Sequence, residues 1–257
     1  MTVVDIVYLL AVGLAGGIIT ALVGGASLVT YPALLAIGLP PITAVIVNLV
    51  ALMPANLSAA WWDRRQLPPI GAPFWAMLVV AGLGATLGAW LLLLTPEKVF
   101  TALVPVLLGL STLLFAYGAQ IARFIESGAS SDSEAERKRW VATILSMVPV
   151  SIYGGYFGAG AGVMLLAILM IVARGDYRGA NAIKNIVAGV NSLAATIVFI
   201  IDGGILWWPV VVVTIGALVG ADIGIRIVRV VPREPMRKAV IGIGVLLTVV
   251  FAWKYWL

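Results

Sequence analysis

The sequence predicts an all-α integral membrane protein with two inverted repeats of about five helical segments each. Three observations lead to this fold class. Apolar residues occupy 62% of the 257 positions and charged residues only 11%, whereas a soluble domain carries about a quarter charged residues. Apolar runs long enough to cross about 30 Å of hydrocarbon recur along the whole chain. The two halves also present similar features in the same order, which indicates an internal duplication.

The first repeat is expected over residues 1–118. Its first segment opens with Asp5 and further membrane segments follow it, so we interpret it as a retained segment rather than a signal peptide. The second segment follows a glycine-rich break and is short for a full span, which favours a half-crossing. An asparagine-bearing segment, a glycine-striped segment and a final segment after proline complete the repeat. The five are expected at 3–23, 24–37, 42–61, 70–94 and 98–118.

The second repeat is expected over residues 140–257, after a polar linker at 119–139. It follows the same order of break, short segment, asparagine-bearing segment and glycine-striped segment, and Asn185 corresponds to Asn48. Its segments are expected at 140–157, 158–173, 178–201, 205–228 and 235–256. The glycine stripes are interpreted as faces on which helices pack closely. They contain Gly84 and Gly88 in the first repeat, and Gly216, Gly220 and Gly224 in the second.

The distribution of basic residues tests whether each glycine break reverses the chain. If the breaks are only kinks, the fifteen basic loop residues divide seven to eight between the two sides. If the breaks reverse the chain, thirteen fall on one side and only Lys98 and Lys254 lie opposite. Cytoplasmic loops carry an excess of Lys and Arg, which favours reversal. We therefore expect a multi-pass protein of the cell inner (plasma) membrane, with linker 119–139 in the cytoplasm and both termini outside.

The two glycine breaks are candidate contacts for a solute. Backbone amides left unpaired in hydrocarbon cost several kcal/mol, so such a break has to face protein, water or solute. The N–H groups and the positive dipole end of a following half-helix favour an anion. The residues concerned are Gly24, Gly25, Ser27, Gly158 and Gly160. A purely structural role, in which the glycines allow a tight hairpin, is the alternative that the breaks alone leave open.

Lys184 favours the anion interpretation. It lies inside an apolar segment, where a lysine costs roughly 2.5 to 3.5 kcal/mol on insertion scales unless it pairs or reaches the interface. No acidic residue stands three or four positions away, so an anionic solute or backbone carbonyls are its candidate partners. The alternative is snorkelling of its side chain to the cytoplasmic interface.

Asparagines on the same segments add polar groups that need partners. Asn48 and Asn185 correspond across the repeat, which favours a paired site, and Asn181 lies one turn before Lys184. For Asn56 and Asn191 we favour ordinary hydrogen bonds between helices.

Composition also excludes several classes of function. The chain contains no cysteine and no histidine, which removes the usual nucleophile, general base and metal ligands. We therefore expect no enzyme, no cofactor, no metal and no nucleic-acid partner. Asp222 is interpreted as a surface ion pair with Arg226, and Asp63 and Asp202 as loop residues, so no carboxylate is assigned to a proton relay.

These motifs resemble the TauE/SafE family of membrane permeases, the sulfite and organosulfonate exporter group, and the resemblance covers nearly the whole chain. Its most specific parts are residues 154–162 (GGYFGAGAG) and 181–185 (NAIKN), with a weaker first-half copy over 24–32 and the turn at 38–41. The resemblance implies export of small anions such as sulfur oxyanions, sulfonates or related organic acids. The first copy departs from the pattern, since it has Gly25-Ala26-Ser27 where family members often have three glycines.

The resulting hypothesis is a secondary transporter that works by alternating access in the lipid bilayer. A small anionic solute would be held near the midplane by Lys184, Asn185, Asn48, Ser27 and the amides beside Gly25 and Gly160. An anion channel that uses the same groups is the alternative. The solute, the coupling ion and the oligomeric state, including a homo-oligomer, are left open by the sequence.

Overall fold

The structure is a computed structural model that describes residues 3–22, 25–67, 70–126, 133–173, 176–227 and 233–256. Within these ranges it contains ten α-helices, one short 3-10 helix and no strand, which confirms the all-α prediction. The helices are α1 (Val3–Leu22), α2 (Ser27–Ala36), α3 (Pro41–Trp62), α4 (Ala72–Leu94), α5 (Glu97–Glu126), α6 (Ser133–Tyr156), α7 (Ala161–Val172), α8 (Tyr177–Asp202), α9 (Trp207–Ile227) and α10 (Arg233–Trp256), with η1 at Arg64–Gln66.

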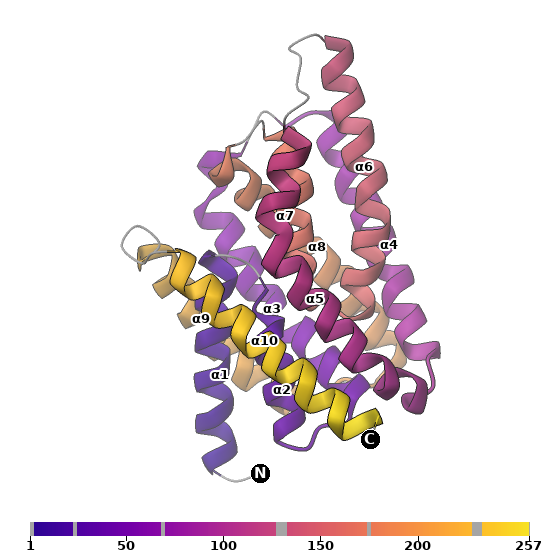
Figure 1. Ribbon diagram of the computed structural model, residues 1–257, viewed down its shortest axis with the longest axis vertical. Coiled ribbons are helices and arrows are strands. Elements are labelled where there is room, and N and C mark those ends of the chain that lie inside the picture. The colour runs from indigo at the N-terminus through magenta and orange to yellow at the C-terminus, as the bar shows by residue number, and fades with distance from the viewer. Residues whose placement is uncertain are drawn as a thin grey trace.

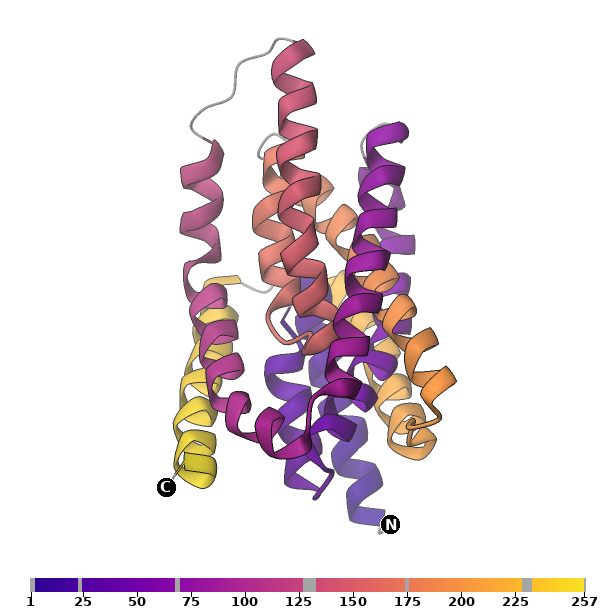
Figure 2. The ribbon, with the colours of Figure 1, turned by 90° about the vertical axis from the view of Figure 1, so that its right-hand side faces the viewer.

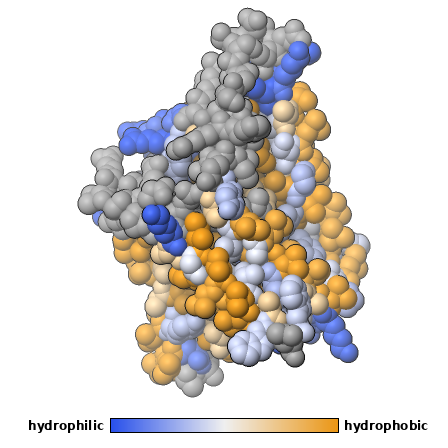
Figure 3. Space-filling view, in the orientation of Figure 1, coloured by the Kyte–Doolittle hydropathy of each residue, from blue (hydrophilic) through white to orange (hydrophobic). Residues whose placement is uncertain are grey.

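Six of the described helices are long and apolar enough to cross a membrane. These spans are Val3–Ala21, Pro41–Trp62, Ala72–Leu94, Tyr177–Asp202, Trp207–Arg226 and Lys238–Trp256. Their outer faces carry exposed large apolar side chains, such as Trp75, Leu83 and Trp90 on α4. Apolar side chains also dominate the lower part of the face in Figure 3. The chain is therefore a multi-pass membrane protein whose outer surface suits lipid.

The connection between the halves is shorter than expected. Helix α5 continues to Glu126 and α6 begins at Ser133, so much of the predicted linker, 119–139, is helical. The residues concerned include several alanines, arginines and glutamates, which favour helix even where they are polar. Polarity alone therefore did not mark the ends of these two helices.

Helices α2 and α7 are the short segments, with 10 and 12 residues. In Figure 1, α2 lies in the lower half of the molecule and α7 in the upper half. Helix α1 begins and α10 ends in the lower part of the same view, whereas α6 begins at the top. Each short helix follows a break in which glycine takes the left-handed conformation, with φ of 88° at Gly25 and 75° at Gly160. Only glycine adopts this conformation readily.

Glycines bring helices of the two halves into backbone contact. Helix α1 packs against α9, and α4 packs against α6. A methyl group added to Gly17 would collide with the carbonyl oxygen of Ala217, and one added to Gly220 would collide with that of Leu14. At the second interface, a methyl group on Gly88 would collide with the carbonyl oxygen of Ile152. The interpretation of the stripes as packing faces is confirmed.

Helices α3 and α8 form the centre of the bundle. They pack against each other, α3 also contacts α9, and α8 also contacts α4. More than half of each is buried, including polar residues such as Asn48 and Lys184. Helices α5 and α10 pack together along one side, as Figure 2 shows. The centre therefore holds polar groups that the surrounding helices shield from lipid.

Candidate functional site

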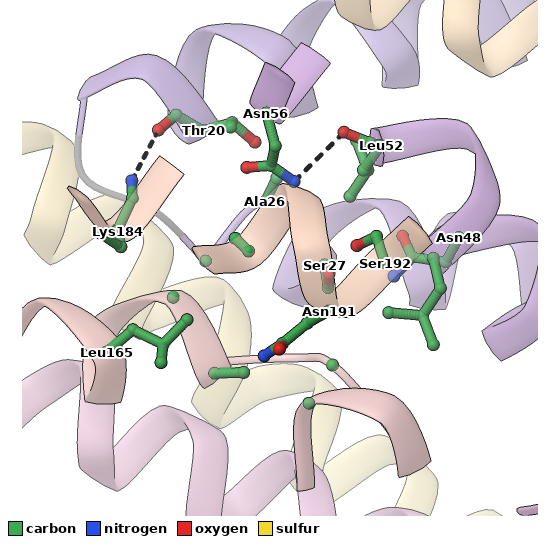
Figure 4. Close-up of a pocket in the computed structure, with 17 residues that line it drawn as sticks. Thr20, Ala26, Ser27, Asn48, Leu52, Asn56, Leu165, Lys184, Asn191 and Ser192 are labelled. Carbon is green, nitrogen blue, oxygen red and sulfur yellow. Dashed lines mark hydrogen bonds between the residues drawn. The ribbon is translucent and has the colours of Figure 1, made fainter. Parts of the chain in front are cut away.

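A cavity of about 60 Å³ lies between the two glycine breaks and the central helices. A cavity of this volume has room for a few water molecules or a small solute. Figure 4 shows the side chains that point into it. Its lining residues in the described chain come from α1, α2, α3, α6, α7, α8 and the breaks, and are Thr20, Gly25, Ala26, Ser27, Asn48, Leu49, Leu52, Asn56, Gly154, Gly158, Ala161, Gly162, Leu165, Lys184, Ala188, Asn191 and Ser192.

Five of the residues proposed from the sequence line this cavity. They are Gly25, Ser27, Asn48, Gly158 and Lys184. The cavity lining does not include Gly160, Asn181 or Asn185, and Gly24 lies outside the described residues. The cavity thus combines groups from both halves of the chain, but only part of the proposed set of site residues lines it.

The N-terminal ends of both short helices point at the cavity. Gly25, Ala26 and Ser27 line it at the start of α2. Gly158 and Ala161 line it at the start of α7. A helix N-terminus carries roughly half a positive elementary charge and N–H groups that suit an anion. Two such ends on one small cavity give it positive potential.

Gly160 has a packing role that explains its absence from the lining. Its φ of 75° requires glycine, and an added Cβ would lie 2.9 Å from the Cβ of Ser111 on α5. The hydroxyls of Ser111 and Tyr153 lie 2.7 Å and 2.9 Å from the neighbouring carbonyl oxygen of Ala159 and 2.6 Å from each other, so one donates to this carbonyl while the other donates within the pair or to the same oxygen. Two side chains thereby satisfy the irregular backbone of the second break, as the membrane interior requires.

Lys184 is fully enclosed, with 1% of its surface exposed. Its Nζ donates a hydrogen bond to the backbone carbonyl of Thr20 at 3.2 Å, in the last turn of α1 (Figure 4). The side chain therefore does not snorkel to the surface, and a backbone carbonyl is its partner, one of the two kinds expected. An ammonium has three N–H donors, so this bond, the one it makes within the described residues, leaves donor capacity for a solute. No described lining residue is a carboxylate.

Asn48 presents an unused donor. Its side chain is fully buried, and the Thr30 hydroxyl donates a hydrogen bond to its Oδ1. Among the described atoms, its Nδ2 has no hydrogen-bond partner. An unsatisfied buried donor costs about 1–3 kcal/mol, so it needs a water or a solute in the adjoining cavity.

Asn191 makes the hydrogen bond between helices that was expected, whereas Asn56 bonds within its own helix, and both residues line the cavity. Asn56 donates to the carbonyl of Leu52 at 3.1 Å, within its own helix. Asn191 donates to the Ser151 hydroxyl of α6 at 3.4 Å, while its Oδ1 has no partner within the described chain. The sequence interpretation favoured the hydrogen bond in each case and missed the place of both residues in the lining.

Asn185 and Asn181 of α8 do not line the cavity. Both are buried, and neither the Asn185 amide atoms nor Asn181 Oδ1 has a partner among the described residues. Asn185 stands four residues before Gly189, which packs against Leu57 of α3, and residues four apart share a helix face, so Asn185 belongs to the α3 side of α8. Asn181 stands three residues before Lys184, N-terminal to the residues of α8 that line the cavity.

The lining residues that the sequence analysis missed include Thr20, Gly154, Gly162 and Ser192. On α8 a helical spacing joins Lys184, Ala188, Asn191 and Ser192. That spacing was present in the sequence and marks the cavity face of the helix. Thr20 contributes a backbone oxygen to Lys184, and side-chain patterns give no signal for such a contact.

The family profile described as sulfite exporter TauE/SafE matches residues 9–251, nearly the whole chain. The protein belongs to the TauE/SafE family. This confirms the resemblance drawn from the glycine breaks and from the asparagine and lysine residues of α8. It also agrees with a membrane transporter rather than an enzyme.

Curated relatives of this TauE/SafE protein have transporter names. A probable membrane transporter protein of Haemophilus influenzae is 26% identical over 244 residues, which cover 93% of this chain and 91% of the relative. The probable membrane transporter protein ORF9 of a Sinorhizobium species is 26% identical, over 85% of this chain and 81% of its own. The probable membrane transporter protein YfcA of Escherichia coli K12 is 21% identical, over 92% and 86%. No solved structure matches the chain.

Proposed function

We propose that this TauE/SafE protein is a secondary transporter that exports a small anion, bound in the cavity between the two glycine breaks. One observation carries the proposal: the N-terminal ends of α2 and α7 and the ammonium of Lys184 converge on the same cavity. Two helix ends and one ammonium make the cavity positive, and none of its described lining residues offers a negative charge in return.

A sulfur oxyanion or a sulfonate is the proposed solute class. The family description names sulfite, and the lining offers the groups that bind such oxygens: an ammonium, a hydroxyl at Ser27 and an unused amide donor at Asn48. Export fits the energetics, because an inside-negative membrane potential favours anion exit by about 2.3 kcal/mol per charge and 100 mV.

The proposed mechanism is alternating access between two inverted repeats in the plasma membrane. If α1 to α5 correspond to α6 to α10, the packing of α1 on α9 corresponds to that of α6 on α4. In the same way, α3 on α9 corresponds to α8 on α4, and α1 on α2 corresponds to α6 on α7. This exchange symmetry supports an inverted repeat, in which a central site opens alternately to each side. The enclosure of Lys184 favours a carrier over an open anion channel.

The test is anion flux in proteoliposomes that contain the purified protein. Efflux of sulfite, thiosulfate and sulfoacetate is measured against concentration, with electrical recording on the same preparation. We expect saturable transport of at least one of these anions, and a Lys184→Ala variant that has lost it. A current that grows without saturation would identify a channel instead, and saturable transport that survives Lys184→Ala would contradict the proposed site.

A further inference from the structure

The carboxylate of Asp63 lies close to the end of α8 that carries Lys184. Asp63 follows α3 directly, outside the membrane-spanning helices, and its N–H donates to the carbonyl of Ala59 at 3.1 Å. It opens η1, which contacts the start of α8. At that contact, a methyl group added to Gly179 would lie 3.3 Å from the carbonyl oxygen of Gln66. The sequence analysis placed Asp63 in a loop, which is correct, but gave no indication that this loop covers α8.

The surroundings of the Asp63 carboxylate connect it with the cavity. Its side chain is partly buried and accepts a hydrogen bond from the side chain of Asn181, less than one helical turn before Lys184. The positive charge of Lys184 favours the ionised form of this carboxylate, and the negative charge of Asp63 favours the charged form of Lys184. Lys184 thus both lines the cavity and interacts with the charge of Asp63.

Burial raises the pKa of the Asp63 carboxyl above its ordinary value of 3.8. The charge of Lys184 and the hydrogen bond from Asn181 oppose that rise, as does the charge of Arg178. The group therefore changes its protonation at a higher pH than an exposed aspartate, nearer to the conditions in which a membrane protein works.

The other charged groups around this turn are engaged elsewhere or exposed. Arg64 donates to the carbonyl of Trp61 at 2.7 Å and lies over the Trp61 ring. Arg65 is exposed. Asp176 caps α8 by accepting from the backbone N–H groups of Arg178 and Gly179. Asp63 is therefore the carboxylate of this region whose charge bears on Lys184.

Resting on the proposed anion transport, we propose that Asp63 is the counter-charge of Lys184 in the empty transporter and that an incoming anion takes over this role. The bound anion and the Asp63 carboxylate then both interact with the ammonium of Lys184. Binding of the anion weakens the hold of Lys184 on the Asp63 carboxylate, which takes up a proton from solvent. Linkage makes the effect reciprocal, so protonation of Asp63 strengthens anion binding by the same factor.

The experiment measures the dissociation constant of thiosulfate for the purified protein in nanodiscs, across the mildly acidic to neutral range. Thiosulfate keeps its charge in this range, so the pH dependence belongs to the protein. We expect the wild type to bind more tightly as the pH falls. Asp63→Asn should bind about fivefold or more tightly than wild type at neutral pH, with a flat pH profile.

Two further variants complete the design. Asp63→Glu keeps the charge and should keep the pH dependence. Asp202→Asn removes an exposed carboxylate at the opposite end of α8 and should follow the wild type. Wild-type and Asp63→Asn profiles that coincide would overturn this inference alone. Absence of saturable thiosulfate binding in the wild type would overturn the sulfur-oxyanion proposal and this inference with it.

Discussion

Lys184 of α8 donates a hydrogen bond to the backbone carbonyl of Thr20, 164 residues earlier in the chain. The bond joins the second half of the protein to the last turn of α1. A cation near a helix C-terminus interacts favourably with the dipole of that helix. Lys184 therefore has a structural partner as well as a place in the cavity, and the two roles have to be separated by experiment.

Lys184→Met separates them, because methionine has a similar length and no charge. We expect saturable anion binding to fall by at least about tenfold, since a close charge-assisted hydrogen bond contributes about 1.5–3 kcal/mol. The melting temperature should not fall, because the variant no longer buries a charge. Lys184→Arg is the charge-preserving control. Lower stability with unchanged anion affinity would show that the lysine only caps α1.

Gly160→Ala should destabilise the protein by about 1–3 kcal/mol, because the site combines a positive φ with a short approach to Ser111. The matched control is Gly242→Ala on α10, where an added Cβ meets nothing within 4 Å. In that helix the change should be neutral or stabilising by up to about 1 kcal/mol. Thermal unfolding in detergent compares the two, and equal melting temperatures would contradict the packing role of Gly160.

The hydroxyls of Ser111 and Tyr153 should act as a unit. Both lie within hydrogen-bond distance of the carbonyl of Ala159 and of each other, so the remaining hydroxyl can donate to this carbonyl when the other is removed. We expect Ser111→Ala and Tyr153→Phe each to cost about 1 kcal/mol of stability, and the double variant to cost more than their sum. A double-mutant cycle on thermal unfolding measures this coupling. Simple additivity would show that the Ala159 carbonyl is satisfied in some other way.

The topology can be tested directly because the chain has no native cysteine. Single variants Arg65→Cys, Lys238→Cys and Lys254→Cys are labelled in intact cells with a thiol reagent that does not cross the membrane. Labelling is expected for Lys254→Cys alone, since the other two positions are predicted to be cytoplasmic. If only one of Arg65→Cys and Lys238→Cys is labelled, the two positions lie on opposite sides of the membrane, and the chain does not reverse at both glycine breaks.

Asp63→Asn should also change how stability depends on pH. The raised pKa means that the fold favours the protonated carboxyl. This stabilising contribution is complete below the unfolded-state value and is lost as the pH rises through the folded-state value. The melting temperature of Asp63→Asn relative to wild type should therefore increase from acidic to neutral pH. A constant difference would show that burial does not perturb this carboxyl.

The parts of the fold predicted from sequence are those that depend on local pattern. Apolar runs and glycine breaks predicted the ten α-helices found in the described residues, because span length and backbone freedom are properties of a short stretch of chain. Lys184 and Asn48 were proposed as site residues because polar groups in apolar helices need partners, and both line the cavity. The ends of α5 and α6 were misplaced because polar residues with high helix propensity continue both helices.

The site was predicted less completely because its contacts join distant parts of the chain. Asn185 was proposed as a site residue because it corresponds to Asn48 across the repeat, yet it stands one residue after Lys184, and one residue turns a helix by 100°, so only Lys184 of the two lines the cavity. Ser111 and Ala159 meet across 48 residues, and no pattern within either segment indicates the contact. Such pairings arise when helices pack together, and the local patterns of a single sequence do not reveal which helices will pack.

The backbone contacts of α1 with α9 and of α4 with α6 constrain how the protein can change shape. Each contact joins a helix from one half of the chain to a helix from the other, at a separation that leaves no room for a methyl group. In the proposed transport cycle, the bodies that move past each other are therefore not the two halves of the sequence. Each of these two helix pairs would move as one piece, to which both halves of the chain contribute.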